Sequence, residues 1–174
     1  MSTCMWTPTP PASMRINFER SFVTPPNVLS FFNFIDLDRG HNWRLDTTAT
    51  NINENGFTIN IETWSDTILY APQACWVAYP EDREHIFSAS VNTQDVRPWY
   101  QPQLKQSKSI SFGNTKFCKH LNIFVALNQF DLDCRAYFRL SAYVGDVSQS
   151  GLIRHIDPWA NTVLYSAGAI IAVK

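Results

Sequence analysis

The feature that most constrains this sequence is an internal repeat. The stretch from residue 61 to 70 reads IETWSDTILY, and it recurs as IDPWANTVLY at residues 156–165, a shift of 95 residues. The same shift brings fifteen identical residues into register between positions 22 and 76, where typical composition would give about three or four by chance. The period is too long for a solenoid repeat, so the pattern predicts two copies of one small domain.

We expect the boundary between the copies at the charged segment Glu81–Glu84, which gives a first domain of residues 1–80 and a second of residues 81–174. The second copy opens with a strand-like segment, Ile86–Val91, that has no counterpart in the first copy at the same shift. The first domain is therefore expected to lack its first strand. The sheet edge that this would expose is a place where another chain or domain can add.

Apolar and polar residues alternate in both copies with the two-residue period of strands. Phe57–Thr63 alternates directly after the turn residues Asn53–Gly56, and Met14–Phe18 shows the same period. No window has the apolar spacing and caps of an amphipathic helix. Short strands separated by turns at intervals of about 8–12 residues are typical of antiparallel sandwiches. We therefore predict an all-β protein of two antiparallel β-sandwich domains.

Composition and charge argue against several classes of protein. A net charge of −1 gives no general attraction to nucleic acid or to a membrane surface, and no run of about 18 apolar residues predicts membrane insertion. Residues 1–11 lack the pattern of a signal peptide, which favours a cytoplasmic protein over one secreted without a recognisable signal peptide. The four cysteines have no CxxC spacing and do not follow the repeat, which favours reduced thiols.

Patterns for catalysis or metal binding are weak. The pairs Asp36–Asp38 and Asp131–Asp133 place two carboxylates on one face of a strand, but without a third ligand a solvated face or turn contact is the interpretation we favour. The four histidines have no zinc spacing. Ser65 beside Asp66 lacks the glycine-flanked turn of a hydrolase nucleophile. We expect no cofactor, no metal and no enzyme activity.

An aromatic and polar cluster recurs with the repeat. In the first copy it consists of Trp64, Ser65, Asp66, Thr67 and Tyr70, and in the second of Trp159, Asn161, Thr162 and Tyr165. One interpretation assigns these aromatic rings to the core. The other assigns them to a ligand that has an apolar face and ordered hydroxyl groups, as a sugar does.

The order and spacing of the motifs resemble the H-type lectin domain. In the first copy the matching motifs are Pro25-Pro26-Asn27-Val28, Leu37-Asp38, Arg44-Leu45, Gly56-Phe57, Thr63–Tyr70 and Trp76. The second copy adds Asp95–Gln103, which is similar to the segment that fungal members carry before the same strand. The resemblance covers nearly the whole chain as two domains. It implies about six strands in each sandwich, assembly as a parallel trimer, and metal-independent sites for galactose or N-acetylgalactosamine between protomers.

Carried over by position, the sugar sites would consist of Trp64, Ser65 and Tyr70 in the first domain and Trp159, Ala160 and Tyr165 in the second. Two positions depart from the snail lectins that this pattern resembles. The residue after the tryptophan is histidine there and Ser65 or Ala160 here. The ligand-binding arginine eight residues before the glycine is replaced by Thr48 and Tyr143, which removes a charge-assisted donor. By its position, Thr48 is still expected among the sugar-binding residues of the first domain.

We therefore predict a multivalent carbohydrate-binding lectin whose partners are glycans and further copies of this chain, with a trimer favoured. The alternative is a structural or protein-interaction module that has lost sugar binding, and the missing arginine favours it. The second domain also has Ile171 in place of Trp76 and Pro158 before its tryptophan. We expect the second domain to be the degenerate copy.

Overall fold

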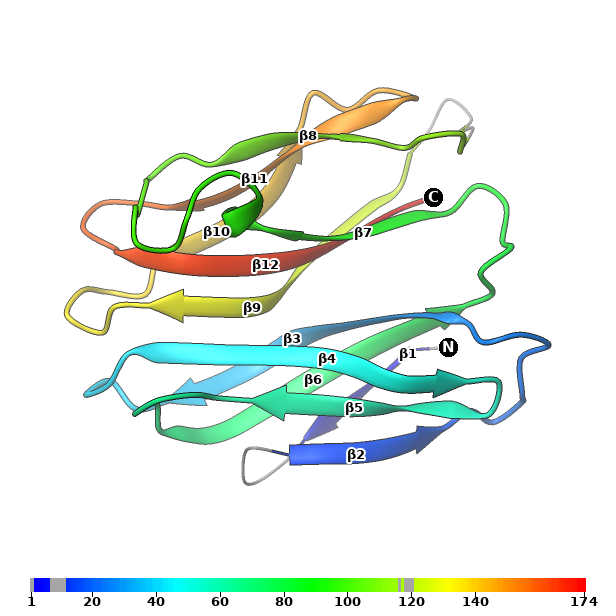
Figure 1. Ribbon diagram of the computed structural model, residues 1–174, viewed down its shortest axis with the longest axis horizontal. Coiled ribbons are helices and arrows are strands. Elements are labelled where there is room, and N and C mark those ends of the chain that lie inside the picture. The colour runs from blue at the N-terminus through cyan, green and yellow to red at the C-terminus, as the bar shows by residue number, and fades with distance from the viewer. Residues whose placement is uncertain (1, 7–11, 116, 118–120) are drawn as a thin grey trace. The chain divides into compact units, whose positions relative to one another are not determined.

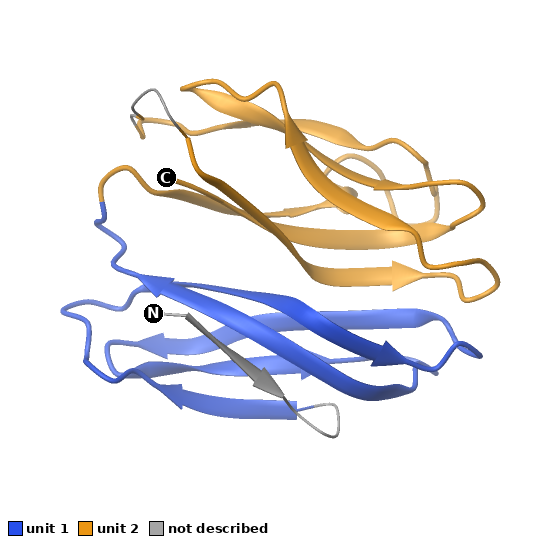
Figure 2. Ribbon diagram, turned by 180° about the vertical axis from the view of Figure 1, so that it is seen from behind, with its two compact units in different colours: residues 1–83 blue, residues 84–174 orange. Residues whose placement is uncertain are grey.

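The computed structural model describes residues 2–6, 12–115, 117 and 121–174, with the backbone alone for 2–6. The chain divides into two compact units, residues 1–83 and 84–174 (Figure 2). The described residues form β-strands in both units, together with one 3₁₀ turn, η1 (Thr93–Asp95). The predicted all-β fold of two antiparallel β-sandwiches is confirmed.

Unit 1 consists of two three-stranded antiparallel sheets (Figure 1). In one sheet β6 lies between β1 and β3, and in the other β5 lies between β2 and β4. The strands are β1 (Ser2–Trp6), β2 (Ala12–Asn17), β3 (Asn27–Leu37), β4 (Trp43–Asn53), β5 (Gly56–Glu62) and β6 (Leu69–Tyr79). One face of the sheet that contains β4 and β5 is buried, with Leu45 of β4 and Phe57 and Ile59 of β5 at most 2% exposed. The ring of Phe57 packs edge-on against Trp76, with the ring centroids 5.2 Å apart.

Unit 2 repeats this arrangement. In one sheet β12 lies between β7 and β9, and in the other β11 lies between β8 and β10. The strands are β7 (Phe87–Asn92), β8 (Ser107–Ser111), β9 (Ile123–Leu132), β10 (Leu140–Gly145), β11 (Gly151–Pro158) and β12 (Leu164–Val173). The side chains of Phe130, Leu132, Ile156 and Leu164 are at most 1% exposed and form the centre of its core.

The expectation that the first domain lacks its first strand is wrong. Strand β1 pairs antiparallel with β6, as β7 does with β12, so the edge that we expected to be exposed is covered by the chain itself. Strands β2 and β8 begin 95 residues apart, at Ala12 and Ser107. The difference between the copies is therefore the connection, which is residues 7–11 in unit 1 and residues 93–106 in unit 2. Because the connection in unit 1 is shorter, β1 does not align with β7 at the fixed shift of 95 residues. A comparison at that shift alone therefore does not reveal β1.

The prediction of reduced cysteines is also wrong, and the error again involves β1 and β6. Cys75 on β6 is disulfide-bonded, whereas the sequence favoured reduced thiols. The register of β1 and β6 places Cys4 opposite Cys75. A pairing between these strands was excluded by the interpretation that unit 1 lacks its first strand.

Two glycines that repeat allow the sheets to close. A Cβ on Gly56 would lie 2.0 Å from the carbonyl oxygen of Ile16, and one on Gly151 would lie 2.4 Å from that of Ile110. Strands β2 and β8 therefore approach β5 and β11 too closely for any side chain. This explains why both positions hold glycine.

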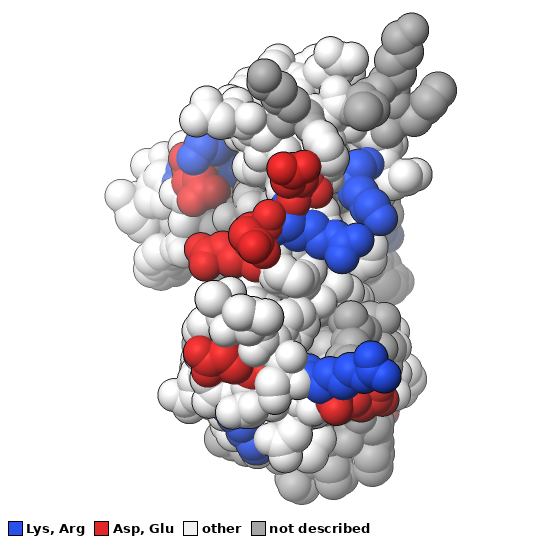
Figure 3. Space-filling view, turned by 90° about the vertical axis from the view of Figure 1, so that its right-hand side faces the viewer, with Lys and Arg blue, Asp and Glu red and all other residues white. Residues whose placement is uncertain are grey.

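Charged side chains of both signs lie on the surface. On the face that Figure 3 shows, acidic and basic side chains lie beside one another and are not gathered into a basic patch. Among the described residues, no helix has the length and apolar character needed to cross a bilayer.

Candidate functional site

In both units, a loop at the end of the sandwich carries the tryptophan that recurs with the repeat. Residues 63–68 connect β5 to β6, and residues 159–163 connect β11 to β12. Ser65 and Ala160 have positive φ angles of 60° and 55°, so the chain turns directly after the tryptophan. Trp64 is 37% exposed and Trp159 is 51% exposed, whereas Trp76 is 4% exposed. Both tryptophans therefore lie in loops that follow a strand, and neither belongs to the core.

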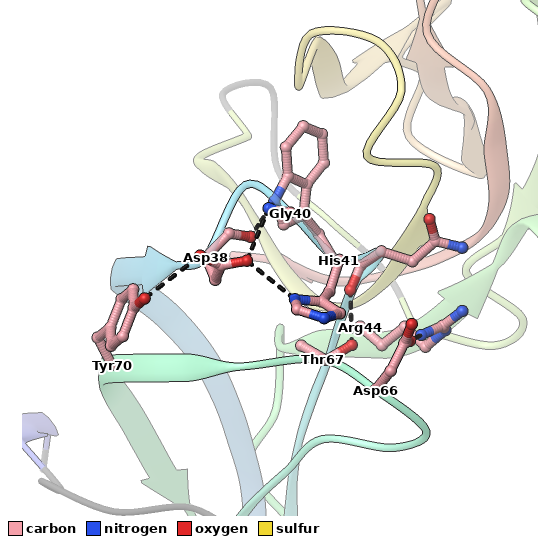
Figure 4. A network of polar contacts seen from close by, with 9 residues as sticks. Asp38, Gly40, His41, Arg44, Asp66, Thr67 and Tyr70 are labelled. Atoms are coloured by element: carbon pink, nitrogen blue, oxygen red, sulfur yellow. Dashed lines mark hydrogen bonds and ion pairs between the residues drawn. The ribbon is translucent and has the colours of Figure 1, made fainter.

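Asp38, which follows β3, organises the polar groups beside this loop in unit 1 (Figure 4). Its carboxylate accepts hydrogen bonds from the Gly40 amide at 2.6 Å, from His41 Nδ1 at 2.9 Å and from the Tyr70 hydroxyl at 3.3 Å. The hydrogen bond from His41 is the main reason that the pKa of Asp38 lies below its ordinary value. Asp38 thus makes a turn contact of the kind that we favoured for the carboxylate pairs.

Two further bonds hold the loop of unit 1 against the segment between β3 and β4. Arg44 Nη1 donates to Asp66 Oδ1 at 2.5 Å, and the Thr67 hydroxyl donates to the Asn42 carbonyl at 2.6 Å. The Arg44 guanidinium lowers the pKa of the Asp66 carboxyl. These bonds hold the two residues that follow the turn at Ser65, directly after Trp64.

Unit 2 repeats the same bonds, each 95 residues along. The Tyr165 hydroxyl donates to Asp133 at 2.9 Å, Arg139 donates to Asn161 at 2.7 Å, and Thr162 donates to the Tyr137 carbonyl at 2.7 Å. The repeated aspartate, arginine, threonine and tyrosine therefore form a hydrogen-bonded corner, and we call each corner with its tryptophan loop a rim. These four residue types recur together in the sequence, but the sequence alone does not show that they take part in the same set of hydrogen bonds.

The cation at the central carboxylate differs between the rims. In unit 2, Arg135 Nε donates to both oxygens of Asp133 at 2.9 and 3.0 Å, and its Nη2 donates to Oδ2. This ion pair holds the pKa of Asp133 far below the ordinary range. Unit 1 has His41 in this role.

A second aromatic group reaches the rim of unit 2 from the connection of residues 93–106. Trp99 packs edge-on against Tyr165 with ring centroids 6.2 Å apart, and Tyr100 lies 5.8 Å from Trp99. Both residues of this connection are more than half exposed. The sequence places this segment before β8 but does not indicate its contact with Tyr165.

Thr48 does not join the predicted site. It lies on β4 opposite Asn60, whose side-chain amide donates a hydrogen bond to the Thr48 hydroxyl at 3.4 Å. Thr48 is exposed to solvent on the sheet and is not part of the tryptophan loop. Its counterpart Tyr143 stacks on His155 with centroids 4.5 Å apart and donates to Asp157 at 2.9 Å. Both positions that correspond to the snail-lectin arginine are therefore occupied by contacts within their own sheet.

Metal ligands do not gather near either rim. Within the part of the chain that the structure describes, no group of three or more histidine, cysteine or acidic side chains is arranged to hold a metal ion. The chemistry that the rims offer is an exposed indole surface beside neutral and acidic hydrogen-bonding groups.

Comparison with known proteins matches the core of both units to one family. The model of the H-type lectin domain matches residues 13–79 and 107–172. A protein of Fuscovulum blasticum described as "ATP synthase subunits region ORF 7" is 34% identical over 82 residues, which cover 46% of this chain and 71% of that protein. The two family matches begin within β2 and at the start of β8, so the connection of residues 93–106 lies outside them.

Proposed function

Since this chain belongs to the H-type lectin domain family, a family of carbohydrate-binding modules, we propose that it is a multivalent lectin. Its ligands would be glycans of the galactose or N-acetylgalactosamine type, bound without a metal at the two rims. The observation that carries the proposal is the pair of exposed indoles, Trp64 and Trp159, each held on a hydrogen-bonded corner.

The physical basis is the match between an indole and a sugar. An aromatic ring covers the C–H face of a pyranose, while fixed donors and acceptors pair with its hydroxyl groups. At the first rim, Ser65 and the half-exposed Tyr70 are the polar neighbours of the ring. Two rims in one chain raise avidity by ~10²–10⁴-fold over a single weak site when both engage one surface.

A protein-interaction module that has lost sugar binding is the second candidate. The observation that favours it is that Thr48 and Tyr143 stand where the resemblance expects an arginine, and that Asn60 and Asp157 already bond them. On this proposal the exposed indoles would contact an apolar protein surface.

Assembly as a homotrimer is the proposed oligomeric state. Its support is the resemblance alone, since β1 covers the edge that we had expected to recruit a neighbour. Light scattering at micromolar concentration should give three times the chain mass of 19.9 kDa. A mass of one chain would remove every site that needs two protomers.

The disulfide at Cys75 supports exposure to an oxidising compartment, because structural disulfides persist in secreted proteins and are rare in the cytosol. We therefore propose the secreted alternative in place of the cytoplasmic one. Mass spectrometry of the native protein after alkylation without reductant would find Cys75 unlabelled. Labelling of Cys75 in protein purified from its own source would contradict this.

A glycan array that compares the wild-type protein, Trp64→Ala and Trp159→Ala, with and without chelator, tests the function. We expect chelator-resistant binding that weakens at least tenfold in each variant and more in the double variant. Ser65→Ala should weaken binding by about tenfold or less, because one neutral hydrogen bond contributes about 0.5–1.5 kcal/mol. Both tryptophans are exposed, so unchanged melting temperatures provide the control. Silence of the wild-type protein on the array would favour the interaction module.

A further inference from the structure

We propose that the rim of unit 2 binds a sugar that carries a carboxylate, and that the Arg139 guanidinium is the group that selects it. The exposed ring of Tyr137 contacts the same sugar. The proposal rests on the proposed lectin function and narrows it, because it gives the rim of unit 2 a class of ligand that the rim of unit 1 does not share.

The repeat places an arginine at the same position of both corners but gives it a different partner. In unit 1, Arg44 donates to the Asp66 carboxylate at 2.5 Å. In unit 2, Arg139 donates to the side-chain carbonyl oxygen of Asn161 at 2.7 Å. The hydrogen bond is therefore kept in unit 2, whereas the negative charge that faces the arginine in unit 1 is absent.

No other carboxylate neutralises Arg139. Among the residues that the structure describes, its contacts are the Asn161 oxygen and the Tyr137 ring, and no acidic side chain forms an ion pair with it. The Asp133 carboxylate of the same corner is already paired with Arg135. The bonded groups of this corner thus include two guanidiniums and one carboxylate, whereas those of unit 1 include one guanidinium, one imidazole and two carboxylates.

The second difference between the corners is an aromatic residue. Tyr137 stands where unit 1 has Asn42, and it is 71% exposed. The Arg139 guanidinium lies over its ring, 4.7 Å from the centroid, and the Thr162 hydroxyl donates to its carbonyl at 2.7 Å. The aromatic ring and the cation are therefore held together beside the loop that carries Trp159.

These groups suit a sugar carboxylate. A guanidinium has five N–H donors, and the printed bond of Arg139 to Asn161 uses Nη1 alone. The planar guanidinium matches a planar carboxylate and bonds it through short, charge-assisted hydrogen bonds. Taking a carboxylate out of water is costly unless a cation replaces the water, so Arg139 favours the acid over a neutral sugar of the same shape. Aromatic rings beside the cation cover the C–H face of the sugar.

A carboxylate on a galactose-type glycan has two common sources. In galacturonic acid it replaces the hydroxymethyl group of the galactose ring. In a sialylated glycan it belongs to a sialic acid that is attached to galactose. The chemistry at Arg139 is the same in both, so the test compares each acid with its own neutral partner.

Titration calorimetry at neutral pH uses the full chain carrying Trp64→Ala, which removes the exposed ring of the first rim. The two ligand pairs are methyl galacturonide with methyl galactoside, and sialyllactose with lactose. In at least one pair, the acid should bind at least tenfold more tightly than its neutral partner at low salt. The preference should decrease as salt is added, because salt screens charges that are partly exposed.

Asn161→Asp gives Arg139 the partner that Arg44 has in unit 1. In the Trp64→Ala parent it should lower the ratio of acid to neutral affinity at least tenfold, and Arg139→Gln should do the same. Arg20→Gln is the matched control, because it changes the net charge of the chain equally at an exposed position between β2 and β3. It should leave the ratio within twofold of the parent. A general loss of binding affects both sugars of a pair, so the ratio reports on the charge.

The outcomes separate this proposal from the lectin function. If the wild-type protein binds glycans but the parent prefers neither acid, selection by Arg139 is wrong and the lectin function stands. A preference that both Asn161→Asp and Arg139→Gln leave unchanged would also overturn it. If the wild-type protein binds no glycan at all, both proposals fail. Should Arg139→Gln not fold, Asn161→Asp against Arg20→Gln decides the question, because it keeps an acceptor for Arg139.

Discussion

The rims of units 1 and 2 share a framework and differ in what surrounds it. Both join aspartate to tyrosine, arginine to the tryptophan loop, and threonine to a carbonyl oxygen, at positions 95 residues apart. Around this framework, unit 1 has an imidazole and an acidic residue, His41 and Asp66. Unit 2 has a guanidinium, a neutral amide and an aromatic segment, provided by Arg135, Asn161 and residues 96–104.

This difference separates two kinds of sequence signal. Residues that recur in both copies, such as Thr67 and Thr162, build the corner that holds each loop. Residues that occur in one copy, such as Arg97 and Trp99, make the surroundings of the two rims different.

The shared framework predicts equal damage in the two units when a repeated glycine is changed. Gly56→Ala and Gly151→Ala each place a Cβ within 2.4 Å or less of a backbone oxygen, so the adjacent strand must move. We expect each to lower the free energy of unfolding by about 3 kcal/mol, measured by chemical denaturation. A loss below about 1 kcal/mol at only one of them would show that the frameworks are not equivalent.

Loss of the central carboxylate should destabilise unit 2 more than unit 1. Asp133 is 2% exposed and is bonded by Arg135 and Tyr165. Asp133→Asn removes the charge that these donors face, and we expect it to destabilise unit 2 by about 2 kcal/mol. Hydrogen exchange of peptides from β9 and β12 measures this locally. Asp38→Asn, at a more exposed position with histidine as its partner, should have the smaller effect in unit 1. Equal losses of stability in the two variants would contradict the expected difference between the central carboxylates of the two rims.

Acid should reduce the difference in stability between the wild-type protein and Asp133→Asn. Because the pKa of Asp133 is lowered on folding, its charge stabilises the folded state above the unfolded-state pKa of about 3.9. This contribution is lost as the pH falls from that value toward the lower folded pKa. The gap between wild type and Asp133→Asn should therefore be constant from about pH 7 to 5 and narrow below about pH 4. A gap that widens in acid would contradict the ion pair.

The smallest effect is expected at the loop turns. Ser65 and Ala160 have positive φ angles that side chains disfavour, so Ser65→Gly and Ala160→Gly should each stabilise the protein by about 1 kcal/mol or less. Thermal melting measures this. Destabilisation by more than that amount would show that the Ser65 side chain contributes bonds to the rim.

The sequence was sufficient to predict the fold class and the two-domain repeat, because alternation and the repeat are both visible in the order of the residues. It was insufficient for β1, since a shortened connection breaks the fixed shift between copies. It also placed Thr48 in the site by position, whereas strand register places it opposite Asn60 on the sheet. Arg97 was missed because its acceptors are carbonyl oxygens of a distant strand, which side-chain patterns do not reveal.

Fluorine NMR of the protein labelled with 5-fluorotryptophan tests the central claim most directly, because the six tryptophans give separate signals. Each is assigned by a tryptophan-to-phenylalanine variant. On addition of methyl α-N-acetylgalactosaminide, the signals of Trp64, Trp99 and Trp159 should shift with saturation, and those of the buried Trp43 and Trp76 should not. Saturable binding of the sugar that leaves all three exposed tryptophan signals unchanged would place its site away from the rims and contradict the account.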